Sequence, residues 1–559
     1  MKHFINARDR IVAEALDGLL LTSGGTLGRL DVSPNIRVVL RLDWDKSRVA
    51  IISGGGAGHE PAHTGFVGPG MLTAAVTGEI FASPSVEAVL AAIRAVTGEA
   101  GCLLIVKNYT GDRLNFGLAA ERARAEGLDV RMVIVADDIA IPGLRQARGI
   151  AGTLFVHKLA GHLSETGHAL DEIEGRAAAL AKEIVSYGVS LTSCAIPGQP
   201  FEERIGPGEA EMGLGIHGET GAERVMLAEA TVVVGAVAER LIEKIDTRRR
   251  HALIINNLGA VPALEMGVIA NAVLTHPSLS GVIELICGPA ALMTSLNMSG
   301  FSLSLVPLDD DRRAAMLADV GPRAWPGFAV PTPLRIVAIA AAAAEIQAEP
   351  SADETVRTVV TAVCKRLIAI EAELNQLDAK AGDGDTGSTI AGGARAILTS
   401  IDVLPLADPG VLCLAMGHLI GSAMGGSSGV LLSIFFTATG EALRSGAALS
   451  AALGQGLKKM RFYGGASRGD RTMIDALEPA IEALAQAGEV PLAALAARSG
   501  ADATARMAKA QAGRSQYIAA GALDGIPDPG AIAVAEAFDA ASIALANNAA
   551  APAEIARVG

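Results

Sequence analysis

An apolar run that ends in polar residues indicates the fold class of the first part of this chain. Residues 102–112 read CLLIVKNYTGD, so five apolar residues lead into a lysine, a glycine and an aspartate. Similar runs at residues 48–52 and 130–135 also end in glycine or polar residues, and helical patterns such as residues 85–96 lie between them. This alternation predicts α/β units whose functional loops follow the carboxyl ends of the strands.

The chain has 559 residues, more than one hydrophobic core usually organises, so several domains are expected. We predict a first part over residues 1–328, divided into α/β subdomains at about 1–186 and 187–328. A proline-rich and polar linker follows at 329–350. Over residues 351–559, Ala, Leu, Glu and Arg recur at helical spacing, which predicts an all-helical part.

The composition and net charge of the chain limit the classes of function that it can have. Half of the residues are apolar and the net charge is −14, which indicates a globular chain whose main partner is not a nucleic acid. Five widely spaced cysteines without a C-x-x-C pair favour reduced thiols. The N-terminus lacks an apolar signal core, and the longest apolar stretch, residues 336–344, is far shorter than the roughly 20 residues that span a bilayer. We expect a soluble, cytoplasmic protein that is not inserted in a membrane.

Three carboxylates form the most specific motif of the helical part. Asp378, Asp383 and Asp385 fall within eight residues, among glycines and hydroxyls. Clustered carboxylates hold a hard cation such as Mg²⁺ through oxygen, and an EF-hand is disfavoured because Gly387 and Ala394 stand where it needs ligands. The alternative is an exposed acidic turn.

Further glycine-rich segments follow in the helical part. Residues 425–429, GGSSG, match the G-x-S-x-G elbow of hydrolases, but residues 411–424 before them predict a helix where that motif requires a strand. A phosphate cradle at a helix N-terminus fits better. The polar, glycine-containing segments at 464–465, 469–473 and 528–530 are weak turn signals individually.

The first part also carries a glycine run, SGGGAGHEP at residues 53–61. It matches neither a dinucleotide fingerprint nor a P-loop. A tight strand-to-helix turn is one interpretation. The other is a polar pocket for a small ligand, because His59 and Glu60 follow the glycines and His63 stands at a spacing of one helical turn from His59.

Two further segments carry groups able to perform chemistry on a small molecule. Lys107 and Asp112 follow a strand, where an aspartate can accept a hydroxyl proton and a lysine can donate to an oxygen; the alternative is a surface ion pair. His217 lies among glycines in residues 213–219. A neutral imidazole can add to a carbonyl carbon, although a lone histidine is more often structural.

Taken together, these motifs resemble the dihydroxyacetone kinase family in its single-chain, ATP-dependent form, from the first residues to near the C-terminus. The resemblance implies a ketone-binding half of two α/β subdomains and a helical half shaped as an antiparallel barrel of helices. It rests on five segments: 53–61, 107–112, 215–219, 382–385 and 426–429.

The resemblance also implies roles for individual residues. His217 would add to the substrate carbonyl to form a hemiaminal, Asp112 would act as general base, and His59 and Lys107 would orient the ketone beside Gly56, Ala57 and Gly58. Asp378, Asp383 and Asp385 would hold Mg²⁺ on the triphosphate of ATP. The nucleotide would be lined by Thr386, Ser388, Thr389, Ser427, Ser428, Gly464, Thr472, Met473, Asp528, Pro529 and Gly530.

The implied activity is phosphorylation of a short-chain ketose, dihydroxyacetone to dihydroxyacetone phosphate, with glyceraldehyde as a further substrate, in a homodimer whose sites form between chains. Two positions depart from the family: Ala57 replaces a usual serine and Thr220 a common proline. These departures leave a four-carbon ketose such as erythrulose open. Two other activities known in the family are cleavage of FAD to cyclic FMN and ketone sensing without catalysis; the filled catalytic positions and the fused nucleotide half argue against sensing.

Overall fold

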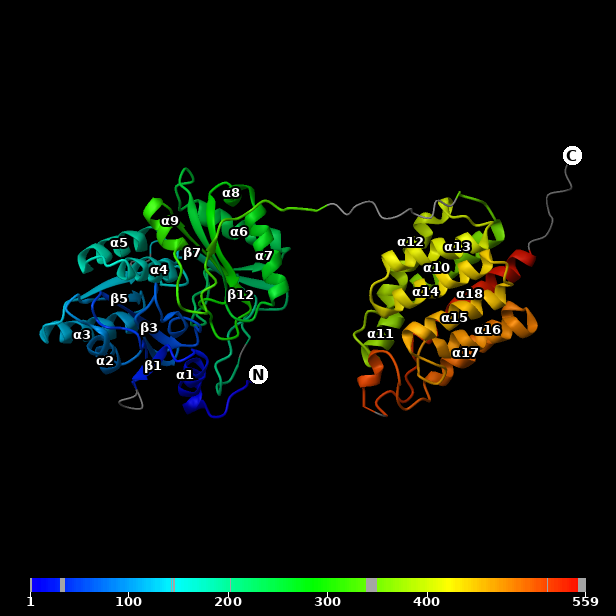
Figure 1. The fold of residues 1–559 in the computed structure, drawn as a ribbon, viewed down its shortest axis with the longest axis horizontal. Helices are drawn as coiled ribbons and strands as arrows, with labels where there is room; N and C mark the ends of the chain where they lie inside the picture. Colours follow the sequence, from blue (N-terminus) through cyan, green and yellow to red (C-terminus); the bar gives the residue numbers. More distant parts are fainter. Residues whose placement is uncertain are drawn as a thin grey trace. The chain divides into compact units, whose positions relative to one another are not determined.

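The structure, a computed structural model, describes residues 3–30, 36–141, 143, 146–201, 203–337, 349–519 and 521–550. It comprises two compact units, Met1–Arg335 and Ile336–Gly559, which are described separately (Figure 1). Of the linker predicted at 329–350, residues 338–348 lie outside the described residues.

The first unit begins with a six-stranded sheet in the order β1-β2-β4-β3-β5-β6. Strand β3 is parallel to both β4 and β5, and β5 is parallel to β6, whereas β1 and β2 run antiparallel to their neighbours. The strands are β1 (Leu27–Leu30), β2 (Val38–Arg41), β3 (Ala50–Ala57), β4 (Ala74–Ile80), β5 (Cys102–Lys107) and β6 (Val130–Val135). The predicted α/β alternation is confirmed over this region.

Helices cover both faces of this sheet because its buried strands are apolar on both sides. Leu104 of β5 packs with α2 and α3, whereas Leu103 and Ile105 pack with α4 and α5. Ser85 caps α2 by accepting a hydrogen bond from the Ala88 backbone N–H. The helices of this part are α1 (Ile11–Thr22), α2 (Val86–Val96), α3 (Thr110–Ala125), α4 (Thr153–Glu165) and α5 (Leu170–Glu183).

A seven-stranded sheet follows, in the order β13-β11-β10-β12-β7-β8-β9. Only β10 and β11 pair in parallel, and the other neighbours are antiparallel. Its inner face shares one core with α4 and α5, and its outer face packs against α6 and α7. The elements are β7 (Val185–Ser190), β8 (Glu209–Met212), β9 (Glu223–Met226), α6 (Ala230–Ile242), β10 (His251–Asn257), α7 (Ala263–Thr275), α8 (Pro277–Ser280), β11 (Ile283–Ala290), β12 (Gly300–Pro307), α9 (Asp310–Leu317) and β13 (Phe328–Ala329).

The glycine run is part of strand β3 and is not the strand-to-helix turn that was one interpretation of the sequence. The strand continues to Ala57 because glycines let its backbone approach its neighbours. A Cβ at Gly54 would lie 2.2 Å from the carbonyl oxygen of Val76, and one at Gly56 would lie 2.7 Å from the backbone nitrogen of Ala82. The spacing of His59 and His63 is likewise not helical, since these residues lie in a turn.

In the second unit, the described residues 349–519 and 521–550 form helices joined by loops, with an isolated β-bridge between Ser351 and Pro405 and no strand. Contacts between helices run from α12 through α13, α14, α15, α16, α17, α18 and α10 back to α12, which forms a closed ring of neighbours. The helices are α10 (Glu354–Ala369), α11 (Glu371–Ala381), α12 (Thr386–Ser400), α13 (Pro409–Ala423), α14 (Gly426–Arg444), α15 (Leu449–Gly464), α16 (Ile474–Ala487), α17 (Val490–Thr504) and α18 (Pro529–Ala550). All five cysteines of the chain are free thiols.

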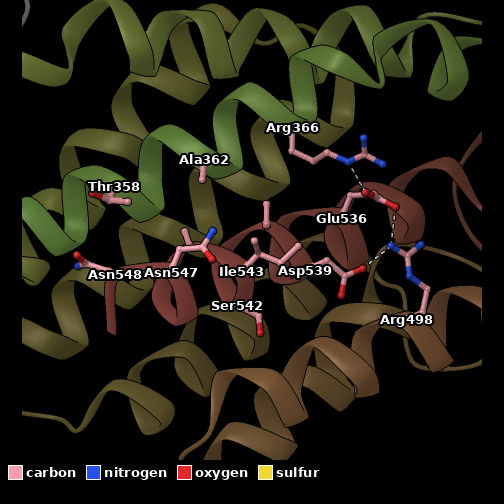
Figure 2. Close-up of a pocket in the computed structure, with 12 residues that line it drawn as sticks. Thr358, Ala362, Arg366, Arg498, Glu536, Asp539, Ser542, Ile543, Asn547 and Asn548 are labelled. Atoms are coloured by element: carbon pink, nitrogen blue, oxygen red, sulfur yellow. Dashed lines mark hydrogen bonds and ion pairs between the residues drawn. The ribbon is translucent and has the colours of Figure 1, made fainter. Parts of the chain in front are cut away.

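Helix α18 is, among the described residues, the one helix long and apolar enough to cross a membrane, which is weak evidence because core helices pass the same test. Figure 2 shows that two of its acidic residues, Glu536 and Asp539, pair with arginines of neighbouring helices. Glu536 accepts from Arg366 of α10 at 2.6 Å and from Arg498 of α17 at 2.5 Å, and Asp539 accepts from Arg498 at 2.5 Å. These ion pairs line a groove of about 920 Å³ and tie α18 into the ring of helices.

Candidate active site

The first site is built around His217, which lies in the loop after β8. Three rings surround it edge-on, with centroids at 4.8 Å for His59, 5.3 Å for Phe81 and 4.3 Å for Tyr109. His59 and His217 are 158 residues apart in sequence, yet their Nε2 atoms lie 3.1 Å from each other. The fold therefore brings together the glycine run, the residue-107 segment and the His217 loop.

Glu219 holds the His217 ring in place. Its Oε2 accepts a hydrogen bond from the His217 backbone N–H at 2.8 Å, and its Oε1 lies 3.2 Å from His217 Nδ1. Burial raises the pKa of the Glu219 carboxyl, but the hydrogen bonds and charge of His217 outweigh burial and bring this pKa to about 2. The carboxylate is thus ionised and assigns the Nδ1 proton to His217, whose other ring nitrogen, Nε2, faces His59.

The hydrogen-bond partner of His59 determines which of its ring nitrogens carries a proton. His59 Nδ1 lies 2.8 Å from the carbonyl oxygen of Thr294, which only accepts, so Nδ1 carries the proton. Burial, and then the charges of Lys107 and His217, hold the pKa of His59 well below its usual range. A neutral His59 therefore presents the lone pair of its Nε2 toward the Nε2 of His217, from which it can accept a proton.

Lys107 and Asp112 do not form the surface ion pair that the sequence left open, because both side chains are buried. Lys107 ends β5, and Asp112 lies in the first turn of α3. The Lys107 Nζ lies 3.0 Å, and the Asp112 Oδ2 3.7 Å, from the position that a Cβ of Gly55 would take. Ser83 donates a hydrogen bond to the other carboxylate oxygen of Asp112. The Asp112 carboxylate, which can act as a base, and the Lys107 ammonium therefore lie in one buried space beside Gly55.

The remaining predicted substrate residues lie at the end of β3. Ala57 is buried, and a Cβ at Gly58 would come within 2.8 Å of the Phe81 ring, so only glycine fits there. Gly58 donates its backbone N–H to Glu60 at 2.9 Å. Thr220, the other departure from the family pattern, is exposed.

The second site is a pocket of about 610 Å³ in the helical unit. It opens where α12 and α14 begin, so backbone N–H groups at both helix N-termini are available to an anion. Ten of the eleven predicted nucleotide residues line it, namely Thr386, Thr389, Ser427, Ser428, Gly464, Thr472, Met473, Asp528, Pro529 and Gly530. Ser388 does not line it, because its hydroxyl accepts from Asn375 at 2.9 Å instead.

The three carboxylates line the same pocket and fit a divalent cation. One ligand atom from each of Asp378, Asp383 and Asp385 lies within 4.8 Å of the others. Asp378 Oδ2 accepts backbone N–H groups of Gly384, Asp385 and Thr386 at 3.0, 3.0 and 3.1 Å, which folds the loop around it. Within the described part of the chain, neither Asp378 nor Asp385 forms an ion pair with lysine or arginine. Three carboxylate oxygens that converge in this way are ligands of the kind that Mg²⁺ prefers.

Three residues of these sites were not among the predicted site residues. Glu219 and Tyr109 flank predicted residues in sequence, but only the folded chain shows their contact with His217. Arg471 is buried in the wall of the nucleotide pocket and donates to the carbonyl oxygen of Ile526 at 2.6 Å. Its Nε and Nη1 have no partner among the described residues. In the sequence, the signal that could have pointed to Arg471 was its position within the polar, glycine-containing segment 469–473.

Comparison with known proteins defines the class of this two-site chain. Residues 25–322 match the Dak1 domain and residues 380–542 match the DAK2 domain. A dihydroxyacetone kinase of Citrobacter freundii is 48% identical over 96% of this chain and 98% of that protein. A triokinase/FMN cyclase of Mus musculus is 41% identical over 96% of this chain and 98% of that protein.

A crystal structure of the C. freundii dihydroxyacetone kinase in complex with AMP-PNP and Mg²⁺ matches with a TM-score of 0.71 and 46% identity, over 97% of this chain and 99% of that one. The chain belongs to the dihydroxyacetone kinase family, and both of its domains are present in one polypeptide.

Proposed function

We propose that this protein is an ATP-dependent kinase that phosphorylates the terminal hydroxyl of a short-chain ketose, converting dihydroxyacetone to dihydroxyacetone phosphate. The observation that carries the proposal is the His217 ring, held at Nδ1 by Glu219 and meeting His59 at Nε2 beside a buried Lys107 and Asp112. Its relatives named dihydroxyacetone kinase and triokinase/FMN cyclase support the same substrate class.

In the first step, the His217 Nε2 must release its proton before it can add to a carbonyl. His59 Nε2, 3.1 Å away, accepts that proton. The freed lone pair forms a carbon–nitrogen bond with the carbonyl carbon, the π electrons move to oxygen, and His59 returns the proton to that oxygen. The product is a hemiaminal on His217, whose ring charge is compensated by the Glu219 carboxylate. A reversible covalent bond fixes a small, uncharged substrate that gains little non-covalent affinity.

In the second step, Asp112 accepts the proton of the free terminal hydroxyl, and the resulting oxygen attacks the γ-phosphorus of ATP as ADP leaves. The hydrogen bond from Ser83 orients the Asp112 carboxylate, and Lys107 donates to a substrate oxygen. Asp378, Asp383 and Asp385 would hold Mg²⁺, which would neutralise charge on the triphosphate. The loops that begin α12 and α14 supply backbone N–H groups and hydroxyls to phosphate oxygens.

The organisation that accompanies this activity is also proposed. The closed ring of helix contacts supports an antiparallel helical barrel for the second unit, and residues 1–328 and 351–559 are taken as the ketone-binding and nucleotide-binding halves. We place the enzyme in the cytoplasm as a homodimer with sites formed between chains.

The test is ADP release with Mg²⁺-ATP for dihydroxyacetone, glyceraldehyde, both erythrulose enantiomers and glycerol. We expect turnover with a ketose, little with glycerol, and loss of ketose turnover in His217→Ala but not in His168→Ala, whose ring lies 31% exposed in a surface turn. The ranking of three- and four-carbon ketoses identifies the preferred substrate. No turnover with any carbonyl compound would refute the proposal, and cleavage of FAD with Mn²⁺ would then assign the lyase activity.

A further inference from the structure

A second pair of histidines lies against strand β3. His63 and His157 are both buried, and their ring centroids are 5.1 Å apart. Both face the buried hydroxyl of Ser53 in β3, at 3.4 Å from His63 Nδ1 and 3.1 Å from His157 Nε2. The mechanism above uses neither of these rings.

The hydrogen bonds of Ser53 fix the protons of both rings. Ser53 has one hydroxyl proton and donates it to the carbonyl oxygen of Ile105 at 2.7 Å. Its oxygen therefore only accepts from the two histidines, so His63 carries its proton on Nδ1 and His157 on Nε2. The other two ring nitrogens, His63 Nε2 and His157 Nδ1, are then bare lone pairs. Both are buried and have no partner among the described residues.

Lys107 supplies the complementary donor. Its Nζ is buried and also has no hydrogen-bond partner within the described part of the chain. Ser53 and Gly55 lie on the same face of β3, about 7 Å apart along a strand. The Lys107 Nζ lies 3.0 Å from the position that a Gly55 Cβ would take. Because Gly55 is the next residue after Ser53 on this face of the strand, the ammonium lies near the hydroxyl that accepts from both histidines. The positive charge of Lys107 also contributes to the lowered pKa of each of these two rings.

From this complementarity we propose that His63 and His157 are positioning residues for Lys107, linked to its ammonium by one buried water molecule. Such a water accepts one hydrogen bond from Lys107 and donates its two protons to His63 Nε2 and His157 Nδ1. This arrangement pairs all three buried groups, and buried polar groups in folded proteins are nearly always paired.

The consequence concerns the ketose. A lysine side chain has four rotatable bonds, so its ammonium needs a fixed partner to present a donor to one substrate oxygen. Asp112 Oδ2 lies in the same space beside Gly55 as the Lys107 ammonium, and the two histidines supply a further partner through the water. Because both rings are neutral, they hold the ammonium without adding a second positive charge to the pocket. The inference rests on the proposed ketose kinase activity.

A double-mutant cycle tests this role. In the full chain, His157→Leu and His63→Leu are each expected to raise the KM for dihydroxyacetone about tenfold, with the KM for ATP unchanged. His162→Leu, a partly exposed histidine on the same helix, is the matched control. His157→Gln keeps a donor and an acceptor, so it should restore the KM to within about threefold. In a Lys107→Met background, His157→Leu should change kcat/KM by less than about twofold, because the residue through which it acts is gone.

The kinetics of these variants can overturn the positioning role in two ways. Equal losses from His157→Leu with and without Lys107 would overturn the positioning role, since a structural defect acts in both backgrounds. A His157→Gln variant that melts at the wild-type temperature but does not restore the KM for dihydroxyacetone would also overturn the positioning role. If the unmodified chain turned over no ketose, the proposed function would fail and this inference with it. Turnover by the unmodified chain without coupling to Lys107 would reject the inference alone.

Discussion

Glu219 shows at the scale of one residue how a neighbour prepares a nucleophile. The carboxylate holds both the backbone and the ring of His217, and its pKa of about 2 lies below the ordinary value of 4.5. A carboxyl whose pKa is lowered by folding stabilises the folded state above its unfolded pKa, and this contribution disappears as the pH falls toward its folded pKa.

We therefore expect Glu219→Gln to lower the free energy of unfolding by about 1 kcal/mol near neutral pH, a value reduced because the side chain is partly exposed. The difference from wild type should be complete above about pH 4.5 and shrink between pH 4.5 and pH 2. Urea unfolding at several pH values measures it, with the exposed Glu229→Gln as control. A difference that grew in acid would contradict the assigned hydrogen bonds.

Asp112 is the residue on which the rate of phosphoryl transfer should depend. Asp112→Asn keeps the size of the side chain and its contact with Ser83 but removes the base. We expect kcat to fall about 10³-fold while the KM for the ketose changes by less than about threefold. Steady-state ADP release measures both constants, and the half-exposed Asp129→Asn serves as control. An unchanged kcat would assign the base to another group.

At the scale of an element, α18 depends on ion pairs as well as on apolar packing. Glu536 is 14% exposed at its side chain and pairs with Arg366 and Arg498 from two other helices (Figure 2). Glu536→Gln should destabilise the helical unit by about 1–2 kcal/mol, because two guanidinium groups lose a charged partner. Chemical denaturation followed by circular dichroism measures the loss.

The matched control is Glu482→Gln. Glu482 pairs with Arg468 at 3.2 Å, but both side chains are more than half exposed, so the change should stay within about 0.5 kcal/mol. Equal effects of the two substitutions would mean that the pairs around α18 contribute no more than surface ion pairs.

The elements also show what sequence reasoning could and could not provide. Strand β5 and helix α2 follow from local patterns, because an apolar run and an N-cap serine are visible in the chain itself. The order of the second sheet does not follow, since two of its antiparallel pairs, β10 with β12 and β12 with β7, join strands that are not consecutive in the chain. Strand β3 extends through the glycine run, where the neighbouring backbone leaves no room for side chains. Local sequence does not reveal that constraint.

The same distinction applies to the sites. Asp378, Asp383 and Asp385 were recognisable because three ligands come from one loop. The partners of His217 and the turn of His63 toward Ser53 depend on contacts between separate segments. Residue types and spacing indicated the chemistry, whereas the fold determines which side chains act together.

At the scale of the whole molecule, each unit contains its own hydrophobic core. The cores of residues 1–335 use both sheets and their helices, and those of the second unit use α10 to α18. We expect residues 1–335 and 349–559, produced separately, to fold and unfold cooperatively, the first binding dihydroxyacetone and the second Mg²⁺-nucleotide.

Neither unit alone should release ADP in a ketose-dependent reaction, whereas a mixture of the two should. Calorimetry and the coupled ADP assay check these expectations. A first unit that is unfolded alone, or a second unit that phosphorylates ketose without it, would contradict the division of labour between the halves.

The most direct test of the account is the carbon NMR spectrum of dihydroxyacetone labelled with ¹³C at its carbonyl and mixed with the protein. We expect the carbonyl signal of the bound ketose to be replaced by that of a tetrahedral carbon bonded to nitrogen, and His217→Ala to show no such signal. A wild-type enzyme that phosphorylates dihydroxyacetone while its bound carbonyl carbon stays trigonal would contradict the covalent role of His217.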